Sequence, residues 1–261
     1  MGERAEVESY LRAISVEAKS CELNDSGSVD CAYFCRCDDG SDYAVKNSDR
    51  NASLPHQEWF CTRLGELAGL VSPAIRIVRV DGRECFGSRW ESGIETGTNN
   101  QNGWWTRAKT GEIDFSLLAP TLSRILAFDL FVHNVDRHLA NYLVVKQRSG
   151  HAILAFDYSQ AWIWNGLPPP PLPLGQQTNT VIALKILRRL FGEFIQFNEA
   201  SLVCQKLRSI KISSIEAIIL EHPSIWLTNQ QKDGILTWWN SVERDQRLSQ
   251  VEEGIKNGSY L

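Results

Sequence analysis

The sequence predicts an α+β fold in which a small strand-rich N-terminal lobe precedes a larger, mostly helical C-terminal lobe. Short alternating segments dominate the first third of the chain, a polar stretch rich in Gly and Asn spans residues 91–112, and apolar residues recur at helical spacing from Phe115 onward. We therefore expect one domain over residues 1–261, with residues 1–90 as the first lobe, 91–112 as a crossover and 113–261 as the helical lobe.

The composition is that of an ordinary globular protein. The 261 residues suffice for a sizeable core, and 43% of them are hydrophobic and 22% charged. The net charge of −4 provides no basic footprint for general nucleic-acid binding. The sequence contains no run of 18 apolar residues, so we expect no membrane span. The charged, amphipathic start MGERAEVESYLRAI is unlike a secretory signal.

The cysteines predict a reducing environment. There are seven of them without a small-domain framework, and an odd number favours reduced thiols. Cys35 and Cys37 share one face of an expected strand, and no second Cys or His pair completes a zinc site with them. We expect ordinary half-buried thiols and a cytoplasmic protein.

The first lobe begins with an expected helix over residues 4–20, where four apolar side chains recur at helical spacing: Val7, Tyr10, Leu11 and Ile14. A turn at residues 24–28 leads to alternating residues typical of a strand over 29–37. The sequence DDGS at 38–41 predicts a tight turn into a second strand, DYAVK, at 42–46.

A second helix is expected over residues 54–70. Ser53 is a suitable N-cap, and Pro55 fits the first turn. An Asp-Gly dipeptide then predicts a hairpin whose strands span residues 74–80 and 84–90.

The densest polar cluster of the chain interrupts the helical lobe. The segment FVHNVDRHLANYLVV, residues 131–145, follows a predicted helix that begins at Phe115 and precedes short strands at 142–146 and 152–156. Buried charges and amides cost several kcal/mol when they are unpaired, so a polar cluster between apolar runs predicts a functional loop.

One spacing in this loop suggests phosphoryl transfer, although the spacing alone is weak. An Asp followed five positions later by an Asn, as in kinase catalytic loops, occurs three times: Asp42/Asn47, Asp129/Asn134 and Asp136/Asn141. Only the third pair lies between a helix and an apolar strand with another acid, Asp157, at the end of the next strand. We therefore select Asp136 and Asn141.

This arrangement matches the needs of a phosphotransferase. Asn141 and Asp157 offer the oxygen ligands that magnesium prefers, and Asp136 can orient an acceptor hydroxyl and take its proton. Lys46, at the end of the YAVK strand, can contact nucleotide phosphates, and Glu58, on the helix face away from the apolar stripe, can orient Lys46. The competing interpretations are a solvent lysine, a surface glutamate, and turn residues at a capped helix end.

Three neighbours of this site receive structural interpretations. Asp129 falls on the apolar stripe of the preceding helix, so we expect a partly buried carboxylate bonded to loop groups, with His133 as a possible partner. Arg137 is expected to hold the loop through backbone carbonyls or Asp157.

These motifs resemble a known family. VDRHLAN at 135–141 and AFDYS at 155–159 look like the signature of phosphatidylinositol kinases and HipA-type kinases. Further features favour the HipA type: Asn134, the YAVK strand, LPxxxE at 54–58 and Gly87-Ser88-Arg89.

The resemblance implies a bilobal protein-kinase-like fold that uses ATP and Mg²⁺. By transfer, Asp136 is the catalytic base, Asn141 and Asp157 bind metal, and Lys46 binds phosphate. The sequence lacks a G-x-G-x-x-G loop, and the candidate phosphate cradle consists of Ser26, Gly27 and Ser28.

We therefore expect an ATP- and magnesium-dependent serine/threonine protein kinase. The family also suggests a protein substrate and an antitoxin or other regulatory partner, without membrane or general nucleic-acid binding. Two alternatives stay open: a small-molecule kinase of the same fold, and a nucleotide-binding pseudokinase that docks a partner.

Overall fold

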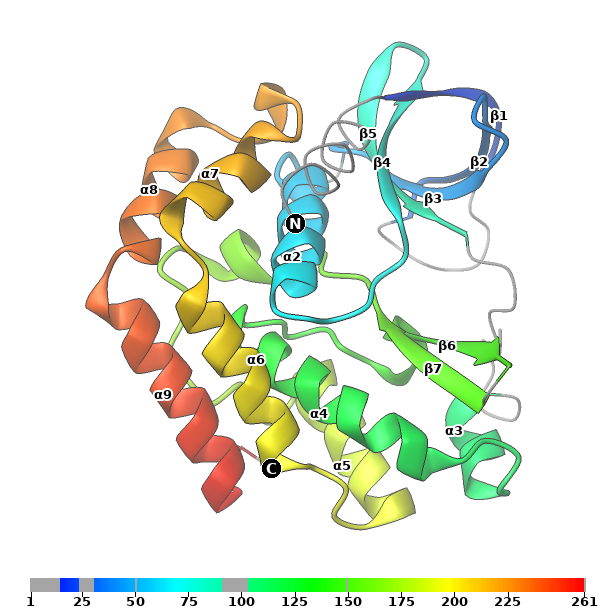
Figure 1. The fold of residues 1–261 in the computed structure, drawn as a ribbon. Coiled ribbons are helices and arrows are strands. Elements are labelled where there is room, and N and C mark those ends of the chain that lie inside the picture. The colour runs from blue at the N-terminus through cyan, green and yellow to red at the C-terminus, as the bar shows by residue number, and fades with distance from the viewer. Residues whose placement is uncertain (1–14, 24–30, 50, 91–102, 149, 261) are drawn as a thin grey trace.

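The computed structural model describes residues 15–23, 31–49, 51–90, 103–148 and 150–260 (Figure 1). It is a mixed α+β structure with a strand-rich N-terminal part and a helical C-terminal part. The N-terminal strands close into a barrel in the order β1-β2-β3-β5-β4. Their bounds are β1 Val16–Leu23, β2 Tyr33–Cys37, β3 Asp42–Lys46, β4 Ile75–Val80 and β5 Arg83–Arg89.

Tight turns and small residues let this barrel close. Asp81 and Gly82 both have positive φ (50° and 76°), which is the geometry of the two-residue hairpin turn that the Asp-Gly dipeptide predicted. At Gly87 a Cβ atom would lie 2.3 Å from Val78 Cγ2, so a side chain there would prevent the close approach of β4 and β5. The two predicted hairpins are confirmed.

The predicted helix over residues 4–20 is wrong where the structure describes it. Val16–Leu23 is strand β1, which pairs antiparallel with β2 and parallel with β4. Pairing on both edges closes the barrel and overrides the local helical pattern, whose apolar residues all lie before residue 15. The remainder of that prediction lies outside the described residues.

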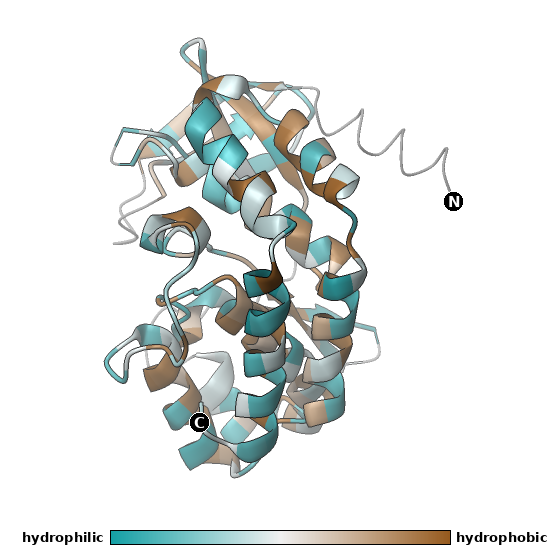
Figure 2. Ribbon diagram, turned by 90° about the vertical axis from the view of Figure 1, so that its left-hand side faces the viewer, coloured by the Kyte–Doolittle hydropathy of each residue, from teal (hydrophilic) through white to brown (hydrophobic). Residues whose placement is uncertain are grey.

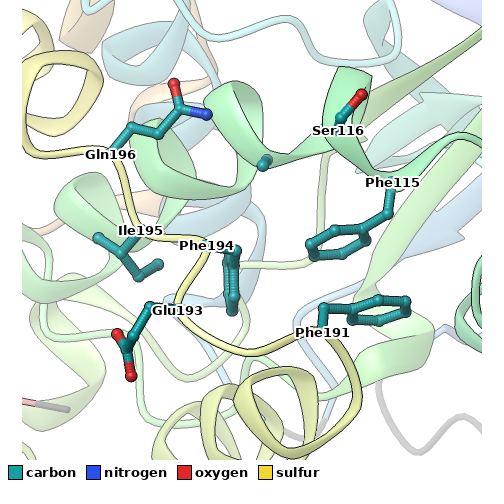
Figure 3. Close-up of a pocket in the computed structure, with 8 residues that line it drawn as sticks. Phe115, Ser116, Phe191, Glu193, Phe194, Ile195 and Gln196 are labelled. Carbon is teal, nitrogen blue, oxygen red and sulfur yellow. The ribbon is translucent and has the colours of Figure 1, made fainter.

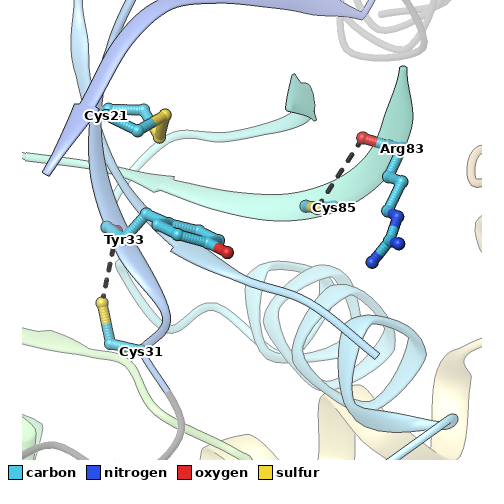
Figure 4. Close-up of a disulfide and its surroundings, with 6 residues drawn as sticks. Cys21, Cys31, Tyr33, Arg83 and Cys85 are labelled. Atoms are coloured by element: carbon cyan, nitrogen blue, oxygen red, sulfur yellow. Dashed lines mark hydrogen bonds between the residues drawn. A yellow bond between two sulfur atoms is a disulfide. The ribbon is translucent and has the colours of Figure 1, made fainter. Parts of the chain in front are cut away.

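The prediction of reduced thiols is also wrong for two cysteines. Cys21 and Cys35 face each other in the β1–β2 register and form a disulfide (Figure 4). Cys35 is therefore no free thiolate ligand. The other cysteines form no disulfide and are buried: Cys31, Cys37, Cys61, Cys85 and Cys204.

Helix α2 (Leu54–Leu67) lies beside the barrel and joins it to the rest of the molecule (Figure 1). Trp59, Phe60 and Leu64 are fully buried in the large core. Pro55 occupies the first turn as expected, but the Ser53 hydroxyl makes no cap hydrogen bond. It accepts instead from Gln231 Nε2 at 3.1 Å, because residues from the C-terminal part reach the start of the helix.

The C-terminal part is built around helix α4, a 17-residue helix that packs on α6, α9 and β7. Its elements are α3 Trp104–Lys109, α4 Phe115–Phe131, η1 Leu139–Asn141, β6 Tyr142–Gln147, β7 Gly150–Ala155, η2 Trp162–Asn165, α5 Asn179–Phe191, α6 Phe197–Ser209, α7 Ile212–Leu220, η3 Ser224–Trp226, α8 Asn229–Trp239 and α9 Val242–Asn257. Helix α3 lies inside the stretch expected to be a crossover.

Two hydrophobic clusters stabilise the described structure. A small one fills the barrel interior, and a large one runs from α2 and the α2-facing side of the barrel through the C-terminal helices. Hydrophobic and hydrophilic bands alternate along these helices, as expected for helices with one buried face (Figure 2). In the described part of the chain, no helix combines the length and apolarity needed to cross a membrane.

Candidate active site

The polar loop after α4 is organised by a buried ion pair. Asp129, in the last turn of α4, and Arg137 are both 0% exposed. Arg137 Nε donates to Asp129 Oδ2 at 2.9 Å and Nη2 donates to Oδ1 at 3.0 Å, a bidentate pair. Burial alone would lower the pKa of Arg137, but Asp129 outweighs it and raises that pKa.

The same guanidinium joins two chain segments. Arg137 Nη1 donates to the carbonyl oxygen of Asn141 at 2.9 Å and also to that of Phe156. Asn141 and Asp157, the residue after Phe156, are therefore brought together at the ends of neighbouring segments. This matches the expectation that Arg137 binds backbone carbonyls.

Asn134 and Thr180 complete the frame of the loop. Asn134 Nδ2 donates to Asp129 Oδ1 at 2.9 Å, and its Oδ1 accepts from the backbone N–H of Asp136 at 3.2 Å. The Thr180 hydroxyl, from the start of α5, donates to the Asn134 carbonyl at 2.6 Å and accepts from the Arg137 N–H at 3.0 Å. The loop is thus fixed from both sides.

The side chain of Asp136 is held by two amides. Its Oδ2 accepts from Gln160 Nε2 at 2.9 Å, and its Oδ1 accepts from Asn179 Nδ2. Its carbonyl oxygen accepts from Asn141 Nδ2 at 3.0 Å, which ties the two predicted site residues directly. Asn141 therefore directs its amide nitrogen toward the loop backbone.

A second cluster joins the barrel to the strand β7 end. Lys46 Nζ, at the end of β3, donates to Glu58 Oε1 at 2.6 Å and to Asp157 Oδ1 at 2.8 Å. Glu58 Oε1 also accepts from the backbone N–H of Tyr158 at 3.0 Å. Asp157 has a positive φ of 64°, a conformation uncommon for residues other than Gly. The structure therefore brings together the predicted Lys46, Glu58 and Asp157.

The charges of this trio are strongly coupled. Burial disfavours the Lys46 ammonium, but Asp157 and Glu58 outweigh burial and raise the pKa of Lys46. Burial likewise favours the neutral form of Asp157, but the charge of Lys46 outweighs the effect of burial and lowers the pKa of that carboxyl. For Glu58 burial dominates and raises the pKa to about 7, because one ammonium serves two carboxylates.

Asn141 and Asp157 fit a magnesium ion by their chemistry. An amide oxygen and a carboxylate are hard oxygen ligands, and Mg²⁺ in nucleotide sites takes one or two carboxylates together with substrate phosphates. Arg137 Nη1 binds the carbonyl oxygens of Asn141 and of Phe156, the residue before Asp157, and so holds the two chain segments that carry Asn141 and Asp157 beside each other. These two side chains could therefore hold a metal jointly with a nucleotide.

The alternative Asp–Asn pairs lie in different surroundings. Asp42 is exposed and pairs with Arg36 at 3.0 Å, while Asn47 bonds to Asp49. Asp129 is the buried partner of Arg137 described above. The phosphate-cradle candidates Ser26, Gly27 and Ser28 lie outside the described residues.

The expected contact between His133 and Asp129 is wrong. His133 Nδ1 lies 3.2 Å from Arg247 Nη2, which also donates to the carbonyl oxygen of Leu130. Arg247 Nε donates to the carbonyl oxygen of Phe131. Arg247 thereby satisfies carbonyls at the end of α4, where helices lack internal partners. Burial and Arg247 lower the pKa of His133 to about 4, so its ring is neutral at pH 7.

The sequence patterns did not predict four side chains that lie at or near the site: Gln160, Asn179, Thr180 and Arg247. Gln160 closely follows Asp157, so its place near the site could have been suspected. Asn179 and Thr180 lie at an ordinary helix start, and Arg247 reads as a surface residue of a polar helix. Only the tertiary fold brings these three to the loop.

A hollow of about 320 Å³ lies elsewhere (Figure 3). It is bounded by the start of α4 and the α5–α6 connection, where the rings of Phe115 and Phe191 stack with centroids 3.7 Å apart. Helix α4 extends about 24 Å at 1.5 Å per residue, and the polar loop follows its opposite end. The hollow is therefore separate from the site.

A family model described as HipA-like kinase matches residues 24–253. Among solved structures, the proinflammatory kinase CtkA of Helicobacter pylori is similar, with a TM-score of 0.52 and 12% identity over 94% of this chain and 99% of that one. This likeness concerns the fold.

HipA of Shewanella oneidensis MR-1, solved with HipB and operator DNA, has a TM-score of 0.46 and 14% identity over 81% of this chain. The chain spans 57% of the length of that HipA chain. No curated protein matches the sequence. Because the family model covers most of the chain, the protein is a kinase that belongs to the HipA-like kinase family.

Proposed function

We propose that this kinase transfers the γ-phosphate of ATP, with Mg²⁺, to a serine or threonine hydroxyl of a protein substrate. One observation carries the proposal: Arg137 ties the carbonyl oxygens of Asn141 and Phe156, so that the Asp136 loop and the Lys46–Asp157 pair meet at one place. A base, two metal ligands and a phosphate-binding cation are what phosphoryl transfer requires.

Asp136 binds and orients the acceptor hydroxyl and accepts its proton as the phosphoryl group is transferred. The amides of Gln160 and Asn179 hold its two oxygens in place, so the carboxylate can meet the hydroxyl without reorganising. A hydroxyl arriving at this carboxylate would share or replace one of these amide contacts.

Lys46 binds the nucleotide phosphates, and Glu58 keeps its ammonium oriented. In the structure Lys46 also contacts Asp157 at 2.8 Å, so phosphate oxygens entering the site would take over part of the role of that carboxylate. Asn141 and Asp157 would then hold Mg²⁺, which supplies positive charge that neutralises the phosphates when bound. The side chains thus divide the tasks of orientation and charge neutralisation.

The test is phosphate transfer from labelled ATP to protein, with mapping of the modified residue. Asp136→Asn should lower transfer by about 10²-fold or more, since it removes a general base. Asp42→Asn is a matched control, because Asp42 has the same spacing to an Asn but is exposed and pairs with Arg36. Equal activity of wild type and Asp136→Asn would contradict the proposal.

The acceptor class is tested in the same experiment. Label on serine or threonine of a protein supports a protein kinase, whereas label only on small metabolites supports a small-molecule kinase. If ATP raises the thermal stability of the protein but no phosphate is transferred to any acceptor, the protein is a pseudokinase. An antitoxin or other regulatory partner and a cytoplasmic location stay predictions that no contact in the described structure tests.

A further inference from the structure

Helix α2 presents two opposite faces to two different parts of the molecule. Glu58 lies on one face, bonded to Lys46 and to the N–H of Tyr158. At 3.6 residues per turn, a second face lies about 160° away from Glu58 and carries Ser53, His56, Trp59 and Arg63. Every one of these four side chains contacts residues 221–231, which comprise the α7–α8 connection and the first turn of α8 and which we call the 221–231 segment.

The strongest of these contacts is an ion pair. Arg63 Nε donates to Glu221 Oε2 at 2.7 Å and Nη2 donates to Oε1 at 3.0 Å, so the pair is bidentate. The side chains are 14% and 7% exposed, which makes the pair more shielded than an ordinary surface pair. Arg63 also binds Glu66 one turn further along α2.

A directional histidine contact lies one turn before Trp59 and two turns before Arg63. His56 Nδ1 and His222 Nε2 are 2.8 Å apart, and His222 Nδ1 lies 3.0 Å from the carbonyl oxygen of Pro223. A carbonyl oxygen only accepts, so His222 Nδ1 carries its proton and His56 Nδ1 donates to His222 Nε2. Burial lowers the pKa of both histidines and keeps this neutral arrangement.

The remaining contacts extend the segment to the barrel. The rings of Trp59 and Trp226 pack edge to face with centroids 6.2 Å apart. Trp226 Nε1 donates to the carbonyl oxygen of Glu84 in β5 at 3.2 Å, and β5 pairs with β3, the strand that carries Lys46. The 221–231 segment therefore binds both the helix with Glu58 and the sheet with Lys46. Helix α7 lies beside α2 in Figure 1, and α8 packs on α7.

We propose that the 221–231 segment is a clamp that fixes α2 relative to the barrel and so holds Glu58 against Lys46, with Arg63 and Glu221 as positioning residues. The inference rests on the proposed roles of Lys46 and Glu58. The Lys46–Glu58 contact is 2.6 Å long and sits on the far side of α2 from the clamp, so a small rotation or shift of the helix separates the two groups. The C-terminal part thereby sets the geometry of the phosphate-binding lysine.

The test is a charge exchange across the clamp. Arg63→Glu and Glu221→Arg each place like charges together, and each should lower kcat/KM for ATP about tenfold, a coupling of ordinary size for a partly buried pair. The effect should include weaker ATP binding in calorimetry, since Lys46 is displaced. The double exchange restores an attractive pair and should recover activity to within about threefold of wild type. Recovery of this kind distinguishes positioning from simple damage.

Three further variants keep the result interpretable. Arg208 and Glu252 form an ion pair at 2.6 Å between α6 and α9, helices that carry none of the proposed catalytic, metal-binding or phosphate-binding residues, so their single exchanges serve as controls and should change kcat/KM less than about twofold. Glu221→Gln keeps the shape of the side chain, and serves where a charge reversal prevents folding. It should weaken ATP binding in the same direction as the reversals.

The outcomes separate this inference from the proposed function. If Lys46→Ala leaves transfer unchanged, the proposed site itself is wrong. If Lys46→Ala abolishes transfer while the Arg63 and Glu221 variants behave like the Arg208 and Glu252 controls, the site stands and the clamp is refuted. Loss in the single variants with recovery in the double exchange supports the clamp.

Discussion

Arg137 and Asp129 form a bidentate ion pair with no solvent exposure, and this pair connects the last turn of α4 to both segments of the candidate active site. Two neighbouring rings further shield the guanidinium, which lies 4.8 Å from the centroid of the Tyr158 ring and 5.7 Å from that of Tyr142. A pair buried this completely is costly to break, because the remaining charge has neither partner nor water.

Asp129→Asn should therefore destabilise the protein by about 3–5 kcal/mol. The new amide group offers one acceptor where Arg137 and Asn134 together need more, so a buried cation loses its counter-charge. Denaturant unfolding measures the change. Asp245→Asn is the control: Asp245 is 55% exposed, and its pair with Arg244 should contribute about 0–1 kcal/mol. Similar losses in the two variants would contradict this account.

The pH dependence of stability should reveal Glu58. Its folded-state pKa of about 7 lies above the ordinary value of 4.5, so between these values the folded protein binds a proton that the unfolded chain has released. The contribution of Glu58 to stability is thus fully present below pH 4.5 and is lost as the pH rises through about 7. Lys46 and Asp157 have pKa values shifted outside this window and stay charged within it.

The measurement compares unfolding free energies of wild type and Glu58→Gln from pH 4.5 to 7.5. Buried histidines with lowered pKa values, such as His56 and His133, give the opposite slope, but they are common to both proteins and cancel in the difference. Relative to Glu58→Gln, wild type should lose stability with rising pH. A difference that stays flat across this range would exclude the raised pKa.

The amides around Asp136 should affect turnover more than nucleotide binding. Gln160 and Asn179 bind the two oxygens of the proposed base, and in the described structure neither side chain is hydrogen-bonded to Lys46 or Asp157. Replacing either one by Ala should lower kcat about tenfold, since the carboxylate loses one orienting donor, while KM for ATP stays within about twofold. Steady-state kinetics with varied ATP separates the two constants. A rise in KM at constant kcat would place these residues in the nucleotide site instead.

The sequence was sufficient for the local parts of this site. The polar cluster at residues 133–141 predicted a functional loop between a helix and a strand, and the side of α2 on which Glu58 lies followed from helical periodicity. The contact between Lys46 and Glu58 agrees with the prediction that Glu58 orients Lys46. Strand β3 and helix α2, which carry these residues, are short, regular and close in sequence. Local patterns therefore predicted what local geometry determines.

The parts that the sequence missed depend on long-range packing. Asn179 lies 43 positions beyond Asp136, and Arg247 lies more than 100 positions beyond the α4 carbonyls that it binds. Helical spacing and propensity carry no information about such pairs. Strand β1 was misassigned for the same reason, because its pairing with β4 links Val16 to Val78 across the barrel. Closure of the barrel, not local preference, decides its conformation.

The cysteine pairing can be checked by counting thiols. The structure joins Cys21 to Cys35 and leaves five cysteines as buried thiols outside any disulfide. Under denaturing, non-reducing conditions, a thiol-reactive reagent should therefore modify five cysteines, and after reduction it should modify seven. A disulfide closing a loop of this size restricts the unfolded chain, so Cys35→Ser should lower stability by about 2–4 kcal/mol relative to the oxidised protein. Seven reactive thiols before reduction would instead restore the prediction of a fully reduced protein.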